Sequence, residues 1–469
     1  MRFPVTFLFI FAVAVWSPAE VIHLKNGKTI WADHVRENGA HLEYDVGDDS
    51  YAILKSSVEK IDAGGVRPDF AAGAATTKEI PDFAPATSLS NEASLAGKVI
   101  HEERVDTDAL SALEQGDPRQ AAVGYFIAGK YEFERGNFSK AGSYFQLAVR
   151  LDPENPGILN YYAAMLVRTG NPDQGLVYAQ RAVQLAPDSA DALAVLGYAQ
   201  FAADRNKDAI QSWKKSLAIR PDPSIQQYLE KAERDSKAEA DFTQRESSHF
   251  TIRYEGKHTP EALRQQLAAT LESEYDDLVR EFGVAPRSSI PVILYTGQAF
   301  FDVTQAPAWS GAINDGKLRI PVEGLNSVSP ELARVLKHEL AHSFINQLSG
   351  GRCPQWLHEG IAQAMEPKSL NGHGQRLAQL FHDQHEIPFN ALEGNFMRFS
   401  PLEAVLAYDE SLAAVDYIND TYGMSDLMRV LQRLNEGSST EAALRSTIHS
   451  DYGQLEGEVA KYLASKYGN

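Results

Sequence analysis

Two histidines and a glutamate in the run His-Glu-Leu-Ala-His, residues 338–342, have the spacing with the clearest chemical meaning. Residues four apart on a helix share one face, so His338 and His342 can bind a single metal ion while Glu339 reaches a water molecule held by that ion. Imidazole nitrogens are common ligands of Zn²⁺, and a carboxylate beside zinc-bound water can act as a general base. The pattern therefore predicts a zinc site that carries out hydrolysis. A solvated His/Glu helix face without metal is the alternative.

A catalytic zinc site needs a third protein ligand and one position left open for water. Metzincins place that ligand six residues after the second histidine, following a glycine, but this sequence has Leu348 and Ile345 at those places. The metzincin class is therefore excluded. A carboxylate from a second helix is the remaining option, and Glu359 follows His342 with sixteen residues between them. The neighbouring His358 is the alternative third ligand.

The elements that must hold these residues are predicted to be helices. Ser329 offers a capping hydroxyl and Pro330 suits a first helical turn. A stop is expected at Gly350, and a second helical run, 359–365, begins at the proposed third ligand. Between the cap and the stop, an apolar stripe at helical spacing consists of Leu332, Val335, Leu336 and Leu340.

Several segments of the C-terminal half resemble the gluzincin, or peptidase MA-like, zinc peptidases. They include HFTIRYEG, GAINDGKLRIPV, HELAHSF and CPQWLHEGIAQAME. The resemblance implies an α+β zincin-like metallopeptidase domain, which we place at residues 247–469. It also implies one Zn²⁺ ion bound by His338, His342 and Glu359. Glu339 would then activate water, in agreement with the spacing of the motif.

The same resemblance implies a sheet edge to which an extended peptide substrate adds as a further strand. Residues 317–321, Lys-Leu-Arg-Ile-Pro, are the best match for that edge. Related aminopeptidases carry Gly-x-Met-Glu-Asn near this place, whereas residues 311–315 read Gly-Ala-Ile-Asn-Asp, which weakens an aminopeptidase assignment. Such enzymes also need a hydrogen-bond donor for the oxyanion, and Tyr408 is the candidate by position. A purely structural role is the alternative in a chain with 19 tyrosines.

Small residues and prolines recur every 34 residues in the middle of the chain. The matching positions are Pro153, Pro187 and Pro221; Gly129, Ala163 and Gly197; Ala141, Gly175 and Ala209; and Ala148, Ala182 and Ser216. This pattern resembles tetratricopeptide (TPR) repeats, so we expect an α-solenoid of TPR repeats over residues 117–237. Such repeats form a concave groove for a partner protein or peptide, and a rigid spacer is the alternative role.

The first residues, 1–19, have the pattern of a secretory signal peptide. One basic residue precedes a short apolar core that ends in small residues, which predicts cleavage and export to the periplasm or the extracellular space. A core of about a dozen apolar residues is short for a membrane span, which needs ~20. We therefore expect no stable membrane span after cleavage, and an uncleaved anchor is the alternative.

Two further regions precede the repeats. Residues 20–63 contain short runs of alternating polarity separated by turn residues, which predicts a small SH3-like β-barrel. Residues 64–116 are expected to be a linker, because Ala, Gly, Pro, Thr and Ser dominate their first part. The predicted fold class is therefore multidomain: a small N-terminal β-barrel, an α-solenoid of repeats and an α+β zincin-like domain.

Charge and cysteine content restrict the partners and the covalent chemistry. A net charge of −19 disfavours nucleic acid and anionic membranes as partners. The single cysteine, Cys353, excludes an internal disulfide. It lies between the two halves of the zinc motif, where a fourth ligand, a redox switch or a buried small side chain are the alternatives.

The sequence thus predicts an exported zinc metallopeptidase with a protein or peptide substrate and a partner protein in the groove of the repeats. The alternative is a non-catalytic TPR scaffold or assembly factor with an inactive peptidase-like domain. The metal content of the purified protein would discriminate between them, because a scaffold does not require zinc.

Overall fold

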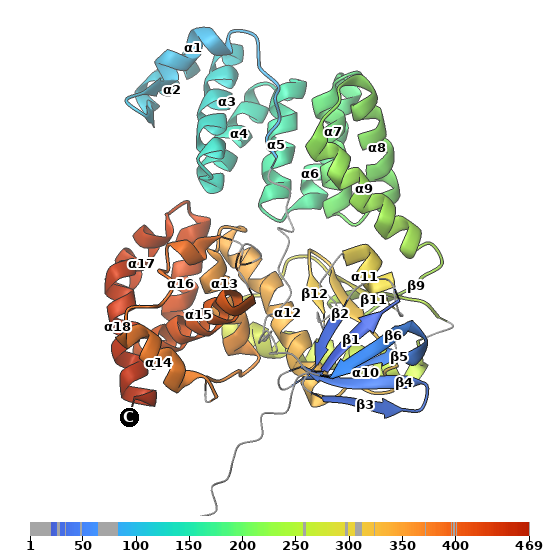
Figure 1. Cartoon of the computed structure of the whole chain (residues 1–469). Helices are drawn as coiled ribbons and strands as arrows, with labels where there is room; N and C mark the ends of the chain where they lie inside the picture. The colour runs from blue at the N-terminus through green and yellow to red at the C-terminus, as the bar shows by residue number, and fades with distance from the viewer. Residues whose placement is uncertain are drawn as a thin grey trace, which may run out of the picture.

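The computed structural model of the chain is mostly helical, with the repeats stacked above a mixed sheet and a helical C-terminal region (Figure 1). It describes residues 20–25, 29–32, 34–46, 49–63, 83–256, 259–295, 299–304, 312–322, 324–370, 372–394, 396, 399 and 401–468. The predicted signal peptide, residues 1–19, lies outside the described residues.

The N-terminal strands form two antiparallel three-stranded sheets, β2-β1-β6 and β3-β4-β5. Their bounds are β1 (Glu20–Leu24), β2 (Thr29–Ala32), β3 (His34–Asn38), β4 (His41–Val46), β5 (Asp49–Leu54) and β6 (Val58–Ala63), with a 3-10 turn, η1, at Lys55–Ser57. Ile22, Leu42 and Tyr44 are buried in one core with Ile293 and Tyr295 of the C-terminal half. This small β region therefore packs against the larger sheet, and its assignment as an SH3-like barrel stays a prediction.

Residues 83–116 differ from the expected linker. They contain α1 (Glu92–Val99), β7 (Ile100–His101), β8 (Arg104–Val105) and α2 (Thr107–Glu114). Leu95, Val99 and Leu110 share a buried core with Phe126 of the first repeat. The linker prediction is wrong for this part of 64–116, because an Ala- and Ser-rich composition conceals an apolar helix face that packs on the repeats. Residues 64–82 lie outside the described residues.

The repeats are antiparallel helix pairs followed by a single helix. Their bounds are α3 (Pro118–Glu134), α4 (Phe138–Leu151), α5 (Pro156–Arg168), α6 (Pro172–Leu185), α7 (Ala190–Ala202), α8 (Asn206–Ile219) and α9 (Pro223–Ala238). Glycines of the 34-residue pattern lie where helices touch. A Cβ atom on Gly129 would meet the ring of Phe145 at 2.7 Å, and one on Gly197 would meet Trp213 at 2.4 Å. The predicted TPR-like solenoid is confirmed.

A mixed sheet of order β12-β13-β11-β10-β9 follows the repeats. Its bounds are β9 (Thr243–Glu246), β10 (Phe250–Tyr254), β11 (Ile290–Tyr295), β12 (Ile313–Asn314) and β13 (Leu318–Pro321). β10, β11 and β13 are parallel, whereas β9 and β12 are antiparallel to their neighbours. Val292 and Leu294 share a core with α10 (Glu261–Phe282) and α12 (Pro330–Ser349), and α11 (Ala299–Thr304) packs on the opposite face. The sheet therefore lies between α12 and the N-terminal strands.

The edge of this sheet is not where the sequence predicts it. Residues 317–321, the expected edge, supply β13, which pairs with β11 on one side and with β12 on the other. Among the described residues, β12 is the outermost strand at this side of the sheet. The prediction is wrong because a strand of two residues has no alternation that a sequence pattern can reveal.

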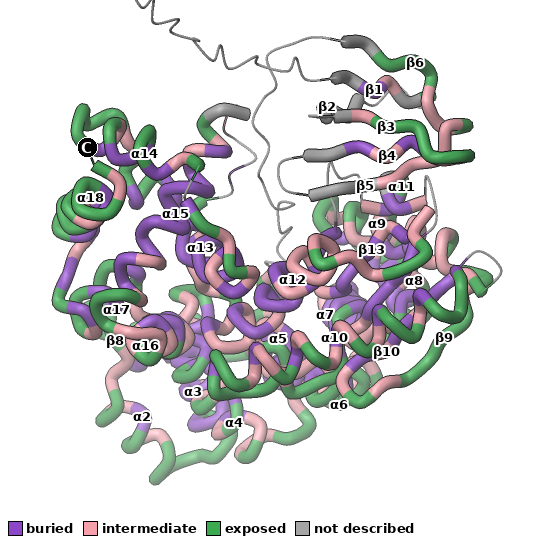
Figure 2. Tube along the Cα trace, turned by 90° about the horizontal axis from the view of Figure 1, so that it is seen from below, coloured by how far each residue is buried: buried purple, intermediate pink, exposed green. Residues whose placement is uncertain are grey.

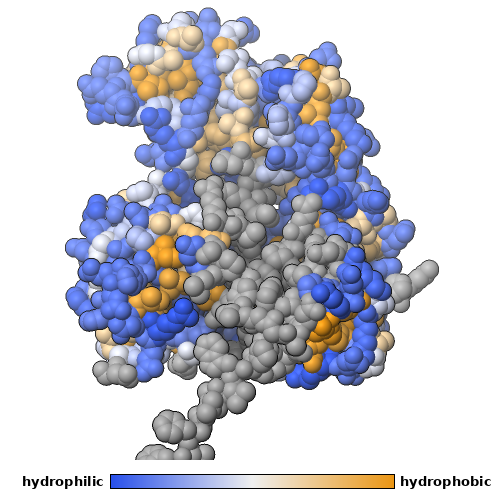
Figure 3. Space-filling model, in the orientation of Figure 1, coloured by the Kyte–Doolittle hydropathy of each residue, from blue (hydrophilic) through white to orange (hydrophobic). Residues whose placement is uncertain are grey.

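The remaining helices cover the side of α12 that faces away from the sheet. Their bounds are α13 (Gln355–Met365), α14 (Gly374–His382), the 3-10 turn η2 (Ala391–Glu393), α15 (Pro401–Tyr422), α16 (Met424–Asn435), α17 (Thr440–Ile448) and α18 (Tyr452–Tyr467). Figure 2 shows that α13 and α15 are largely buried within this group. Hydrophilic residues cover most of the described outer surface in Figure 3, as expected for a net charge of −19.

Buried charges join the repeats to the sheet. Arg319 on β13 is 1% exposed. Its guanidinium donates to Asp235 Oδ2 of α9 at 2.7 Å and to Asp315 Oδ1 at 2.8 Å. Lys317 Nζ lies 2.6 Å from Asp204 Oδ1, in the turn between α7 and α8. Arg319 lies on β13 and Lys317 directly precedes it, so the last repeat is fixed to the strand next to the sheet edge.

We expect Arg319→Met to lower the free energy of unfolding by ~3–5 kcal/mol, because it leaves Asp235 and Asp315 buried without their main counter-charge. Urea denaturation followed by circular dichroism measures the change. Arg280→Met is the matched control, since Arg280 pairs with Asp277 at the surface, where such pairs contribute about 0–1 kcal/mol. Equal destabilisation by the two changes would contradict the structural role of the buried cluster.

Candidate metal centre

Helix α12 presents both histidines of the motif to one buried point. Ser329 caps its start by accepting a hydrogen bond from the amide of Leu332, and Gly350 ends it with a φ of 61°. The side chains of His338 and His342 are buried, with ring centroids 4.9 Å apart and planes nearly perpendicular. The predicted helix, its cap and its stop are confirmed.

Helix α13 brings Glu359 to the same point. Glu359 Oε2 lies 3.5 Å from Nε2 of His338 and 3.8 Å from Nε2 of His342. The close packing of α13 on α15 depends on Gly360, where a Cβ atom would meet the carbonyl oxygen of Ser411 at 2.3 Å. The three predicted ligands therefore come together from two helices, although they are separated in the sequence.

The ligand atoms fit a bound cation better than they fit the protein alone. Nε2 of His338, Nε2 of His342 and Oε2 of Glu359 are buried without a hydrogen-bond partner, whereas buried polar groups are almost always paired. Ligands about 2.0–2.1 Å from a tetrahedral Zn²⁺ lie ~3.3 Å apart, close to the separations of 3.5 and 3.8 Å seen here. Glu359 Oε2 is thus at ligand spacing from each imidazole. His338, His342 and Glu359 together are not among the described groups whose ligand atoms all lie within 4.8 Å of one another, so binding of one divalent cation by all three requires the two imidazoles to move closer together.

Two side chains outside the motif contact the proposed ligands and were not predicted from the sequence. Gln355 Nε2 donates to Glu359 Oε1 at 2.8 Å. Glu366 Oε1 lies 3.3 Å from Nδ1 of His338. A carboxylate at this nitrogen fixes the orientation and the tautomer of a ligand histidine. Gln355 precedes Glu359 by four residues and Glu366 follows it by seven, so helical spacing is the signal that could have identified both.

We expect Glu366→Gln to weaken zinc binding by about 10- to 100-fold, the usual effect of losing the outer partner of a ligand histidine. Competition with a chromogenic zinc chelator measures the affinity. Glu441→Gln, on the exposed surface of α17, is the matched control and should leave the affinity unchanged. An unchanged affinity in Glu366→Gln would mean that this carboxylate does not position His338.

Glu339 is held beside the ligands by the sheet edge. Asn314 on β12 donates through Nδ2 to the main-chain carbonyl of Glu339 at 2.7 Å and to Ser343 Oγ at 2.7 Å. Burial raises the pKa of the Glu339 carboxyl to about 8, with His338 opposing and Glu359 adding to the rise. With this pKa the carboxyl group is largely protonated at neutral pH, and a cation bound beside it would lower the pKa and favour the carboxylate that a general base requires. The arrangement suits a general base.

The two histidines have pKa values shifted in opposite directions. Burial alone would lower the pKa of His338, but nearby carboxylates raise it to about 10; they belong to Glu366, Glu359 and Glu339. Burial and the neighbouring imidazoles of His358 and His338 keep the pKa of His342 well below its usual 6.5. Without a cation, His338 therefore carries a proton among carboxylates. Binding of a cation would release that proton.

His358 is the competing third ligand. It belongs with His342 and Glu359 to one of two overlapping groups of potential metal ligands in the described residues, and the other consists of His338, Glu339 and His342. Its ring stacks on that of His342, with centroids 4.5 Å apart and an interplanar angle of 11°. Its Nε2 lies 3.2 Å from Asn346 Oδ1. Glu359 Oε2 lies 3.5 Å and 3.8 Å from the two motif histidines, whereas Nε2 of His358 lies against Asn346, so the geometry favours the carboxylate.

Tyr408, on α15, is buried close to the carboxylates of the site. Burial raises the pKa of its phenol well above 10, and the charges of Glu359 and Glu339 raise it further. Gln363 Nε2 donates to the main-chain carbonyl of Tyr408 at 3.0 Å and so fixes α13 to α15 here. The phenol remains protonated at neutral pH and can act as a hydrogen-bond donor.

Cys353 has no place in either group of potential metal ligands among the described residues. Burial, with the charge of Glu359, raises the pKa of its thiol well above the usual value. A protonated thiol is a poor metal ligand and a poor nucleophile. The structure therefore favours the interpretation of Cys353 as a packing residue.

Comparison with known families assigns both parts of the chain. Residues 274–465 match the Peptidase MA superfamily, and residues 165–223 match a tetratricopeptide repeat. The chain joins a peptidase MA domain to tetratricopeptide repeats. His338, His342, Glu359, Glu339 and Tyr408 all lie within the matched peptidase MA region.

Solved structures similar to the chain include TPR proteins. The N-terminal domain of stress-induced protein-1 from C. elegans is 22% identical, with 25% of this chain and 98% of that chain covered and a TM-score of 0.23. MamA from Desulfovibrio magneticus is 17% identical over 32% of this chain and 88% of its own, with a TM-score of 0.24. An O-GlcNAc transferase of Thermobaculum terrenum is 15% identical over 81% and 99%, with a TM-score of 0.26. No curated protein matches the sequence.

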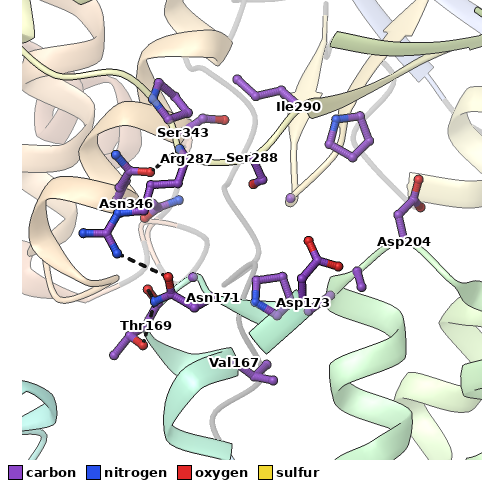
Figure 4. Close-up of a pocket in the computed structure, with 18 of the residues that line it drawn as sticks. Val167, Thr169, Asn171, Asp173, Asp204, Arg287, Ser288, Ile290, Ser343 and Asn346 are labelled. Atoms are coloured by element: carbon purple, nitrogen blue, oxygen red, sulfur yellow. Dashed lines mark hydrogen bonds between the residues drawn. The ribbon is translucent and has the colours of Figure 1, made fainter. Parts of the chain in front are cut away.

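A cavity of about 720 Å³ lies between the repeats and the peptidase MA domain. In Figure 4, the labelled residues Val167, Thr169, Asn171 and Asp173 line it from the repeats, and Arg287, Ser343 and Asn346 line it from the peptidase MA domain. Arg287 Nη1 donates to Asn171 Oδ1 at 3.2 Å between the two sides. None of the three proposed metal ligands lines this cavity, so it is separate from the metal centre.

Proposed function

We propose that the chain is an exported zinc peptidase of the gluzincin type, whose repeats bind proteins or peptides. The observation that carries this proposal is the convergence of His338, His342 and Glu359 through buried, unpaired ligand atoms. Glu339, the residue next to the first ligand, would be the general base. The matches to the Peptidase MA superfamily and to a tetratricopeptide repeat support the same assignment.

Bound Zn²⁺ would lower the pKa of water toward ~7 and polarise the carbonyl group of the scissile bond. Glu339 would accept the proton of the attacking water and deliver it to the leaving amine. Asn314 holds the main chain of Glu339, so the carboxylate projects from a fixed position on α12. The hydroxyl group of Tyr408 would donate a hydrogen bond to the developing oxyanion.

An extended substrate would add to the sheet at β12. Ile313 and Asn314 form the outermost strand on this side of the described sheet. Asn314 bonds directly to α12, so a peptide paired with β12 would run beside the helix that carries Glu339. Main-chain pairing of this kind accepts many side chains, which suits a peptidase acting on an unfolded segment.

We expect the zinc-loaded protein to cleave members of a peptide library, and we expect cleavage to stop after treatment with EDTA and to return with added Zn²⁺. The reason is that the proposed hydrolysis requires the bound cation, and its proposed ligand atoms have no hydrogen-bond partner in the described structure. Mass spectrometry of the digest measures cleavage. Circular dichroism of the EDTA-treated protein is the control for folding. A folded, zinc-loaded protein that cleaves no peptide would contradict the proposal.

A non-catalytic scaffold is the second candidate function. The observation that favours it is the near-complete burial of the site, because His338, Glu339, His342 and Glu359 are 5%, 2%, 0% and 0% exposed. A scaffold of this kind would perform its biological role equally well after Glu339→Gln. A catalytic role instead requires the site to open to substrate, which lid motions allow in many enzymes.

We also propose that the protein is exported. The support is the signal-like pattern of residues 1–19, a short apolar core after a basic residue. No helix among the described residues is long and apolar enough to cross a membrane. Fractionation of cells that express the full chain, followed by N-terminal sequencing, tests both export and cleavage near residue 19.

A further inference from the structure

Helices α5 and α7 of the repeats hold a segment of the same chain. Residues 83–90, Phe-Ala-Pro-Ala-Thr-Ser-Leu-Ser, precede α1 and run in front of α5 in Figure 1. Residues 83, 85, 87 and 89 are buried or half-buried, whereas residues 84, 86, 88 and 90 are exposed. A period of two is that of an extended chain with one face against a surface. We call residues 83–90 the cis segment.

The first half of the cis segment is held through its ring and its main chain. The ring of Phe83 stacks on Tyr198 of α7 with centroids 3.9 Å apart and an angle of 17°. Arg168 of α5 donates through Nη1 to the carbonyl oxygen of Phe83 at 3.4 Å. The hydroxyl group of Tyr161 donates to the carbonyl oxygen of Pro85. Such contacts with alternate residues are typical of bound peptides.

The second half is held by a hydroxyl group and an apolar side chain. Thr87 Oγ1 donates to Asp191 Oδ2 of α7 at 3.0 Å. Leu89 lies over Gly157 of α5, where a Cβ atom would meet Leu89 Cδ2 at 2.5 Å. Gly157 therefore provides the space that this leucine fills. The segment thus lies along a surface of α5 and α7 that contacts an aromatic ring, a proline, a hydroxyl group and a leucine at separate places, and we call this surface the groove.

One groove residue is left unsatisfied by the cis segment. Asn160 on α5 is 1% exposed, and neither Oδ1 nor Nδ2 has a hydrogen-bond partner. Asn160 follows Gly157 by three residues on α5, so the two residues lie on the face of the helix that the segment covers. A buried amide normally pairs, and a peptide main chain offers both the donor and the acceptor that it needs. An occupant that pairs with Asn160 would therefore bind better than the cis segment does.

We propose that the cis segment is an internal, imperfect occupant of the groove, and that a partner peptide of the same pattern displaces it. The partner would be an extended, uncharged stretch that begins with an aromatic residue. Counted from that residue, proline would follow at the second position, threonine or serine at the fourth and leucine at the sixth. This inference rests on the proposed peptide-binding function of the repeats. Residues 64–82 connect the cis segment to the N-terminal strands, so displacement would alter the tether between those strands and the repeats.

The probe is a labelled peptide with the sequence of residues 80–91, and fluorescence anisotropy measures its binding to the full chain. The chain carries Glu339→Gln so that the proposed peptidase activity does not cleave the probe. A tethered occupant competes at an effective concentration in the millimolar range. We expect Phe83→Ala, Thr87→Ala and Leu89→Ala together in the full chain to increase the affinity for the probe at least ~10-fold. The matched control carries Ser88→Ala and Ser90→Ala on the exposed face of the segment. Its affinity for the probe should equal that of the chain without these changes.

A disulfide lock tests the same idea without removing packing. Thr87 Oγ1 and Asp191 Oδ2 lie 3.0 Å apart, so cysteines at the two positions would face each other, and titration of free thiols in the oxidised chain shows whether the disulfide has formed. We expect the oxidised Thr87→Cys, Asp191→Cys chain to bind no probe and the reduced chain to bind it. Equal binding before and after reduction would overturn the proposal.

A folded triple-alanine chain with no gain in affinity would overturn it as well. Loss of peptide hydrolysis would contradict the catalytic proposal and leave these outcomes unchanged.

Discussion

Glu339→Gln is expected to retain zinc and to lose ~10²- to 10⁴-fold of the rate of peptide hydrolysis, the usual contribution of a general base. Glutamine has nearly the same shape as glutamate but cannot accept the proton of water. Nε2 of His338, Nε2 of His342 and Oε2 of Glu359 are unaffected by the change. Metal content by mass spectrometry and turnover of a cleaved library peptide measure the two properties separately.

The control for this change is Glu281→Gln, which makes the same substitution on the exposed surface of α10. It should leave both zinc content and turnover unchanged. Unchanged turnover in Glu339→Gln would reject the proposed base. Loss of zinc from that variant would instead show that Glu339 belongs to the ligand set, as its place in the group with His338 and His342 allows.

Glu359→Ala should weaken zinc binding by more than ~100-fold, because loss of a direct ligand exceeds the 10- to 100-fold effect of losing an outer partner. Only the two histidines would remain to hold the ion. His358→Ala should change the affinity by less than about 10-fold, because its ring stacks on His342 and its Nε2 faces Asn346. Competition with a zinc chelator measures both affinities under one condition.

The comparison of these two variants decides the third ligand. Unfolding curves of both variants in the absence of zinc control for general damage to α13. If only the change at His358 removes the metal, the carboxylate assignment is wrong. In that case His338, His342 and His358 would be the residues to test as the ligand set.

Local signals made α12 and the repeats predictable from the sequence. Ser329 and Gly350 act within a few residues of themselves, so the helix ends follow from local chemistry. Gly129, Ala163 and Gly197 recur with a period of 34 because each repeat places a small residue at the same helix contact. The approach of Glu359 to both histidines could be inferred from the spacing of the motif and from the family resemblance. The distances of 3.5 and 3.8 Å required the structure.

Contacts between distant segments could not be predicted in this way. Asn314 reaches Glu339 across 25 residues of sequence, and the strand that carries it has two residues. The cis segment reads as a linker because Ala, Pro and Ser favour no regular structure, and its partners Tyr198 and Asp191 lie more than 100 residues away. A composition-based prediction cannot recognise an extended chain whose order comes entirely from the surface beneath it.

The ionic cluster at β13 has a consequence for how such a molecule can evolve. Arg319 and Lys317 belong to the half that matches the Peptidase MA superfamily, but Asp235 and Asp204, which neutralise them, belong to the solenoid. Exchange of either half for an unrelated module would leave buried charges without their partners. The two halves must therefore be inherited together, and substitutions on one side of the junction are expected to be matched by substitutions on the other.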